Sequence, residues 1–141
     1  MIQYIAEEIE LPTLEKRNIS RWIKETAAEY GKKVGEIAYI FCSDARILEV
    51  NKQFLNHDYY TDIITFDYTE SNIISGDIFI SVDTVKSNAE EFGVTFQAEI
   101  QRIMIHGILH LCGQDDKTPD LRLEMTRKED LAINRLKIKG S

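Results

Sequence analysis

The stretch from Phe96 to Cys112 constrains the fold most, because an apolar sequence with two histidines lies between a helix start and a helix stop. Thr95 is a typical N-cap residue, and Gly113 can adopt the left-handed conformation that ends a helix. We therefore predict a central helix over residues 96–112, packed by the other elements. A chain of 141 residues has the usual size of one domain, and we expect residues 1–141 to form it.

Hydrophobic spacing and turn residues predict the remaining elements. The expected strands cover residues 4–11, 36–42, 63–68 and 77–82, with a polar turn over residues 69–76. The other expected helices cover residues 14–30, 44–55, 84–92 and 118–136, followed by a frayed tail over residues 137–141. The order β-α-β-α-β-β-α-α-α predicts an α/β (α+β) single domain, with a mixed sheet of about four strands packed by helices.

Composition limits the compartment and the partners. A net charge of −7 argues against broad nucleic-acid binding, which needs a basic face, but a bound dication can still attract RNA locally. The only cysteines, Cys42 and Cys112, form no CxxC pair, which favours a reducing compartment over a disulfide scaffold. The N-terminus is acidic and no apolar run is long enough to span a bilayer. We expect a soluble, cytoplasmic protein without a membrane partner.

The segment HGILHLCGQDD, residues 106–116, carries the chemistry. His106 and His110 are four residues apart on the predicted helix, so their imidazoles project from one face and can reach one metal ion. After the turn at Gly113, Asp116 can approach the same ion. The spacing HxxxHxxGxxD matches the metzincin order of helix, glycine turn and third ligand. Asp115 competes with Asp116 as third ligand, or accepts a hydrogen bond from a histidine ring.

The residues around the histidines narrow the type of site. HExxH peptidases carry their water-activating glutamate where this chain has Gly107, so a peptidase is disfavoured. Two nitrogens and one carboxylate leave a coordination position open, as a hydrolytic zinc site requires. A structural zinc would need a closed set of four ligands, and Cys112 points to the far side of the helix. Non-haem iron also accepts two histidines and a carboxylate, so another transition metal remains an alternative to zinc.

Segment 106–116 resembles the signature HGxLHLxGYDH of the YbeY family, bacterial endoribonucleases that mature ribosomal RNA. Three further segments resemble family motifs in the same order, so that the resemblance covers nearly the whole chain. These are residues 51–66 (NKQFLNHDYYTDIITF, family N..YR..D.PTDVLSF), 76–80 (GDIFI, family LGDI) and 125–129 (MTRKE, family M...E). The resemblance implies a small α/β fold with a metal cleft and three histidine ligands. The first two correspond to His106 and His110, and the third to Asp116.

Several family positions differ in this chain, which indicates a divergent branch. The family's cleft arginine, a phosphate contact, falls on Leu55, and leucine cannot hold a phosphate. Family tyrosines fall on Phe54 and Gln114, and the proline before the Thr-Asp pair falls on Tyr60. Asp116 in place of histidine is still a competent zinc ligand. RNA cleavage is inferred from the resemblance, and these positions are the ones at which this chain departs from the family pattern that supports the inference.

The resemblance implies a metal-dependent, single-strand-specific endoribonuclease that acts in ribosomal RNA processing and ribosome maturation. Its partners would be ribosomal RNA and the ribosome, and not DNA. One Zn²⁺ ion per chain, or another transition metal, would be held by His106, His110 and Asp116. Asp115 is a candidate general base. His57 could meet a phosphate or a leaving oxygen, although a solvent-exposed histidine at a helix end is the simpler interpretation.

Two functions of other classes remain open at this point. A ribosome-associated assembly factor with a structural metal is favoured by Leu55. A metallohydrolase of a small substrate is compatible with the open coordination position. For Asp62, the family match favours a structural or ligand-orienting role over direct catalysis.

Overall fold

The computed structural model describes residues 1–56 and 61–140, with side chains described up to residue 137. The strands are β1 (Ile2–Ala6), β2 (Lys33–Cys42), β3 (Ile63–Asp67) and β4 (Ile73–Ser81). The helices are α1 (Lys16–Glu29), α2 (Asp44–Leu55), α3 (Val82–Phe92), α4 (Phe96–Leu111) and α5 (Pro119–Gly140). The predicted order of elements is confirmed. Among the described residues, no helix has both the length and the apolar character that a membrane span requires.

The four strands form one mixed sheet in the order β1-β2-β4-β3. β1 and β4 both run parallel to β2, whereas β3 pairs antiparallel with β4. The predicted fold class, an α+β domain with a mixed sheet, is confirmed. β3 is left at one edge of the sheet, with β4 as its only neighbouring strand among the described residues.

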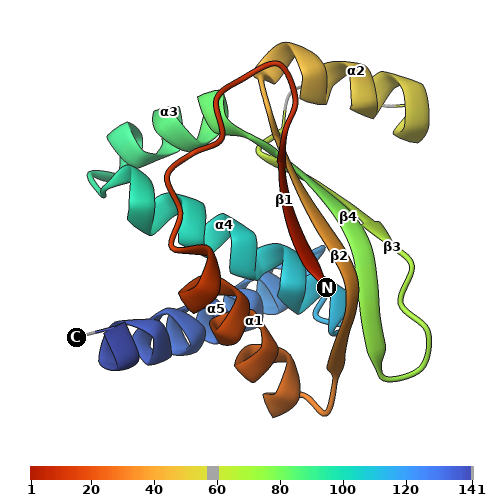
Figure 1. Cartoon of the computed structure of the whole chain (residues 1–141), viewed down its shortest axis with the longest axis vertical. Coiled ribbons are helices and arrows are strands. Elements are labelled where there is room, and N and C mark those ends of the chain that lie inside the picture. The colour runs from red at the N-terminus through yellow and green to blue at the C-terminus, as the bar shows by residue number, and fades with distance from the viewer. Residues whose placement is uncertain (57–60, 141) are drawn as a thin grey trace.

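Helices cover the two faces of the sheet unequally (Figure 1). One face packs against α1, α3, α4 and α5 in the larger apolar core, and the smaller cluster on the other face lies beneath α2. α4 is the central helix, since Ile100, Met104, Ile105 and Ile108 are all fully buried. Tyr39 of β2 donates its hydroxyl to the Met104 carbonyl across 2.9 Å, which satisfies a buried polar group inside this core.

The helix start predicted at Thr95 and the helix stop predicted at Gly113 are confirmed. Ser43 and Thr95 cap α2 and α4 by accepting hydrogen bonds from backbone N–H groups three residues ahead. α3 ends at Gly93 (φ 66°), and Gly113 (φ 102°) follows the end of α4. Both glycines take the left-handed backbone that other residues adopt only with strain.

Some predicted strand boundaries are wrong. One strand ends early at a backbone turn, and two strands begin early because they pair with each other. The strand predicted to reach Leu11 ends at Ala6, and Glu8 beyond it has a φ of 59° that breaks extended structure. The turn predicted over residues 69–76 is too long, because β4 starts at Ile73, where it pairs with Lys33 of β2. β2 also starts earlier than predicted because this pairing continues through its first residues.

The C-terminal tail, predicted to fray from residue 137, instead continues α5 to Gly140. Trp22 of α1 donates its indole N–H to the Ala132 carbonyl across 2.7 Å, and Ala132 belongs to the main core. Tertiary contacts of this kind hold α5 against the domain. Helix propensity alone gives little indication of such contacts.

Gly76→Ala is expected to destabilise the protein by about 1 to 3 kcal/mol, because overpacking forces the backbone to shift. An added Cβ would lie 2.4 Å from the Phe66 carbonyl oxygen of β3, within the ladder that pairs Asp67 with Gly76. Urea unfolding measures the loss, and amide hydrogen exchange locates it. Protection should fall in β3 while β1 keeps its own. An unchanged unfolding midpoint would contradict the clash.

Candidate metal centre

α4 brings His106 and His110 together on one face. Their ring centroids lie 4.6 Å apart and their planes are nearly perpendicular, at 83°. Both side chains are partly exposed, at 20% and 28% of their surface. The pair is therefore anchored by a buried helix and is still open to an ion or a substrate from solvent.

The turn after α4 carries Asp116 back to the histidines. The Gln114 N–H bonds to the Leu109 carbonyl across 2.9 Å, which folds the chain back after Gly113. Asp116 Oδ2 then lies 3.3 Å from His106 Nε2. The same oxygen lies 3.4 Å from His110 Nε2. The structure thus brings together the three residues for which the sequence predicted metal binding.

The geometry of this group suits a small transition-metal ion. Oxygen and nitrogen ligands about 2.0 to 2.1 Å from a tetrahedral zinc lie about 3.3 to 3.4 Å from one another. The two distances from Asp116 to the histidines have these lengths. All three ligand atoms lie within 4.8 Å of one another. The group His106, His110 and Asp116 could therefore hold a metal ion.

The other predicted site residues are placed differently. Asp115 Oδ1 accepts the N–H groups of Asp116 and Lys117, at 2.7 and 3.2 Å, so this carboxylate stabilises the turn. It is not part of the three-ligand group. His57, the other candidate catalytic residue, lies outside the described residues, as does Tyr60.

Gly107 occupies a position where a side chain would enter the core. Its added Cβ would lie 3.1 Å from Ile78 and 3.2 Å from Ile63, both on the sheet beneath α4. A larger side chain at this position would therefore press against the sheet. The small residue at position 107 suits the close packing of α4 on β3 and β4.

Sequence reasoning missed the residues that surround His106 on its other side. Glu129 of α5 places Oε2 2.6 Å from His106 Nδ1. Its other oxygen accepts from Arg102 Nη1 across 2.8 Å. Two signals point to it: Glu129 ends the segment that matches the family's M...E motif, and it occurs at helical spacing between Met125 and Ala132, which are both buried. A carboxylate in such an apolar stripe requires a buried partner.

A cleft of about 310 Å³ opens beside the metal group. It is lined by Ile63, Thr65 and Asp67 of β3 and by His110 and Leu111 of α4. Alternate residues of a strand share one face, so β3 presents one continuous side of this cleft. An extended polymer could lie along the strand and reach His110.

Comparison with known proteins identifies the family. The model of the family described as Endoribonuclease YbeY matches residues 2–137. The chain belongs to this family.

The matches to related YbeY proteins extend over nearly the whole length of both chains. The Endoribonuclease YbeY of Parabacteroides distasonis is 60% identical over 132 residues, which are 94% of this chain and 93% of that protein. The Endoribonuclease YbeY of Azobacteroides pseudotrichonymphae is 42% identical over 137 residues, 96% of this chain and 98% of that protein. A solution structure of a Thermotoga maritima protein superposes with a TM-score of 0.66 at 26% identity, covering 99% and 93% of the two chains. The resemblance drawn from the sequence is confirmed.

Two further carboxyl groups lie on the histidine side of this YbeY domain. Burial raises the pKa of Asp62, and the charge of His106 opposes that rise. Burial also raises the pKa of Glu99, whose carboxylate accepts a hydrogen bond from the Asn88 amide. Burial alone would lower the pKa of His106, but Glu129 and then Asp116 and Asp62 raise it. Several acidic groups therefore favour positive charge at this end of the cleft.

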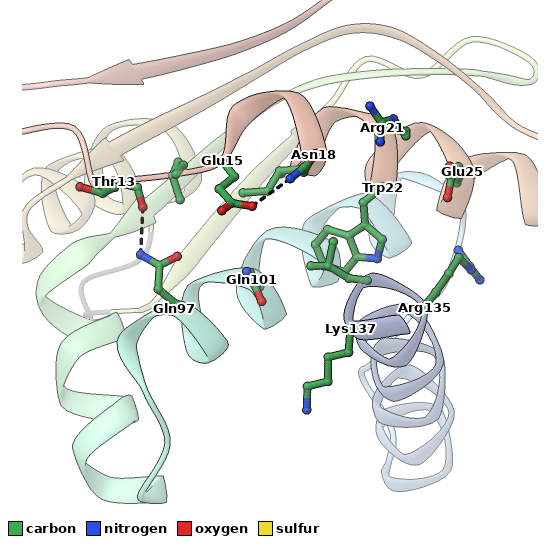
Figure 2. A pocket seen from close by; sticks show the side chains of 13 residues that line it. Thr13, Glu15, Asn18, Arg21, Trp22, Glu25, Gln97, Gln101, Arg135 and Lys137 are labelled. Atoms are coloured by element: carbon green, nitrogen blue, oxygen red, sulfur yellow. Dashed lines mark hydrogen bonds between the residues drawn. The ribbon is translucent and has the colours of Figure 1, made fainter. Parts of the chain in front are cut away.

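A larger hollow of about 650 Å³ lies between α1, α4 and α5 (Figure 2). Trp22 stands in its middle, and the Gln97 amide bonds the Thr13 carbonyl across 2.9 Å at one end. Gln97 precedes His106 by two and a half helical turns, so the two side chains leave opposite sides of α4. Among the described residues, no histidine or cysteine lines this hollow. His110, one of the three predicted metal ligands, lines the smaller cleft instead.

Proposed function

We propose that this chain is a metal-dependent endoribonuclease of ribosomal RNA, formed as one hydrolase domain over residues 1–141. As a member of the YbeY family it is an endoribonuclease, a hydrolase of RNA phosphodiester bonds. The observation that carries the metal dependence is the convergence of His106, His110 and Asp116, of which His110 also lines the cleft beside β3. Zinc is the proposed ion, and the cytoplasm, where ribosomes mature, is the proposed compartment.

The residues of the chain divide the work in this proposal. His106, His110 and Asp116 would hold the ion, whose chemistry is Lewis-acid polarisation of a phosphate oxygen and acidification of water. β3 would orient the RNA along the cleft, where a single strand fits the open edge better than a duplex. Asp115 remains the proposed proton acceptor through Oδ2, because Oδ1 is engaged by the turn.

The experiment compares metal-stripped protein with the same protein after zinc is restored, acting on ribosomal precursor RNA. Cleavage should require the metal and should favour single-stranded segments over a matched duplex. Cleavage at the same rate after the metal is removed would contradict the metal dependence. Binding to ribosomes without cleavage under either condition would favour the assembly-factor alternative.

Leu55→Arg is expected to increase RNA affinity and to steepen its salt dependence by about one counterion. Leu55 is the last residue of α2 and 38% exposed, so an arginine can extend into solvent, where a helix C-terminus also favours its charge. RNA binding measured at several salt concentrations gives both quantities.

Phe92→Arg is the matched control, because Phe92 is also the last residue of a helix and 61% exposed. The ends of α2 and α3 lie on opposite sides of the molecule (Figure 1). Phe92→Arg should change RNA binding little. Equal effects of both variants would mean that Leu55 does not face the RNA path.

A further inference from the structure

Three side chains, Arg102, Glu129 and His106, form a hydrogen-bonded series that links α5 to the metal group. Arg102 and His106 are neighbours one turn apart on α4, and Glu129 of α5 reaches both of them. Arg102 also bonds Asp130 across 2.7 Å through its other terminal nitrogen. The Glu129 carboxylate therefore has one oxygen on a guanidinium and the other on an imidazole.

Burial makes this arrangement more than a surface ion pair. The Glu129 side chain is only 8% exposed, whereas that of Arg102 is 35% exposed. A buried carboxylate loses its hydration and is tolerated only where charged or hydrogen-bonding partners replace the water. Glu129 has such a partner on each oxygen, so its position and orientation are fixed from two sides.

The contact decides which nitrogen of His106 is free. A carboxylate can only accept, so a neutral His106 must carry its hydrogen on Nδ1 to satisfy the 2.6 Å contact with Glu129. The lone pair is then left on Nε2, the atom that faces Asp116. Without Glu129, the imidazole could equally carry its hydrogen on Nε2, where it would block a metal ion.

We propose that Glu129, itself held by Arg102, is the positioning residue of the metal centre and keeps His106 Nε2 free to bind the ion. The proposal rests on the metal site proposed above, but its structural part concerns the metal-free protein. Glu129 does not touch the ion or the RNA and acts only through His106. Carboxylates in this role typically contribute about 10- to 100-fold to metal affinity.

The test measures the His106 tautomer and zinc affinity separately. Long-range ¹H–¹⁵N correlation spectra of metal-free protein, recorded in alkaline buffer, report which ring nitrogen carries the hydrogen. Competition with a chelator gives the zinc dissociation constant. Glu129→Gln should add an Nε2–H population at His106 and weaken zinc binding about 10- to 100-fold. Arg102→Gln, at the partly exposed end, should weaken zinc binding by a smaller factor.

Glu124→Gln is the matched control, since Glu124 lies on the same helix and pairs with Arg127 but has no hydrogen bond or ion pair with His106 or His110. It should leave the tautomer and the zinc affinity unchanged. If Glu129→Gln does not fold, Arg102→Gln decides the question alone. A parent tautomer and parent affinity in the folded variants would overturn the proposal. If no protein binds zinc yet the tautomer shifts, the proposed metal site is wrong and the orienting role of Glu129 stands.

Discussion

The His106→Ala, His110→Ala double variant is expected to lose its metal ion and its RNA cleavage together while it keeps its fold. The change removes both nitrogen ligands of the three-residue group and leaves Asp116 alone. A metal ion supplies several kcal/mol of charge stabilisation to phosphodiester cleavage, and each 1.36 kcal/mol is tenfold in rate. Cleavage should therefore fall by about 10³-fold or more.

Elemental analysis gives the metal content per chain, which should be about one ion in the parent. Circular dichroism checks the fold, which should survive because both histidines lie at the partly exposed edge of α4. His57→Ala is a control that makes the same change of side chain, since His57 is the chain's third histidine. It should keep its metal content. Metal content that is unchanged in the double variant would exclude this site.

The grouping of His106, His110 and Asp116 could be predicted because their arrangement is local. His106 and His110 share a face by helical periodicity, and the glycine after α4 determines where the chain turns. Eleven consecutive residues, 106–116, therefore contain the whole group. Local geometry is what sequence spacing encodes most directly, and here tertiary packing does not need to bring distant segments together.

Glu129 could not be predicted in the same way. It lies on another helix, and only the packing of α5 on α4 brings it to His106. The early start of β4 has a similar origin, because Ile73 joins the sheet through its pairing with Lys33, forty residues earlier. The spacing of residues within one segment does not predict contacts of this kind with distant segments. A buried charge in an apolar stripe indicates that a partner exists, but not which residue it is.

Asp116→Asn is expected to weaken zinc binding strongly. Loss of a residue that only orients a ligand typically costs about 10- to 100-fold in metal affinity, and the loss here should be larger. The Asp116 carboxylate places one oxygen against both histidine nitrogens. An amide oxygen carries no formal charge and is a poor ligand for zinc, which prefers thiolate, imidazole and carboxylate. The competition assay with a chelator measures the loss directly.

Asp115→Asn provides a control that removes the same charge one residue away. Asparagine can still accept the two backbone hydrogen bonds by which Asp115 Oδ1 holds the turn. Zinc affinity should therefore stay near that of the parent. If Asp115→Asn lost as much zinc affinity as Asp116→Asn, the negative charge of the turn would support zinc binding, and not a bond from Asp116 to the ion. A larger loss would reassign the third ligand to Asp115.

Asp116→His completes the comparison, because it removes the charge but supplies another good zinc ligand. Zinc affinity should be retained or increased, as expected if position 116 itself contacts the ion. The longer imidazole has room, since Asp116 is 32% exposed. If Asp116→His binds zinc as weakly as Asp116→Asn, the carboxylate acts on the histidines by charge alone, and the ion takes its third ligand from elsewhere.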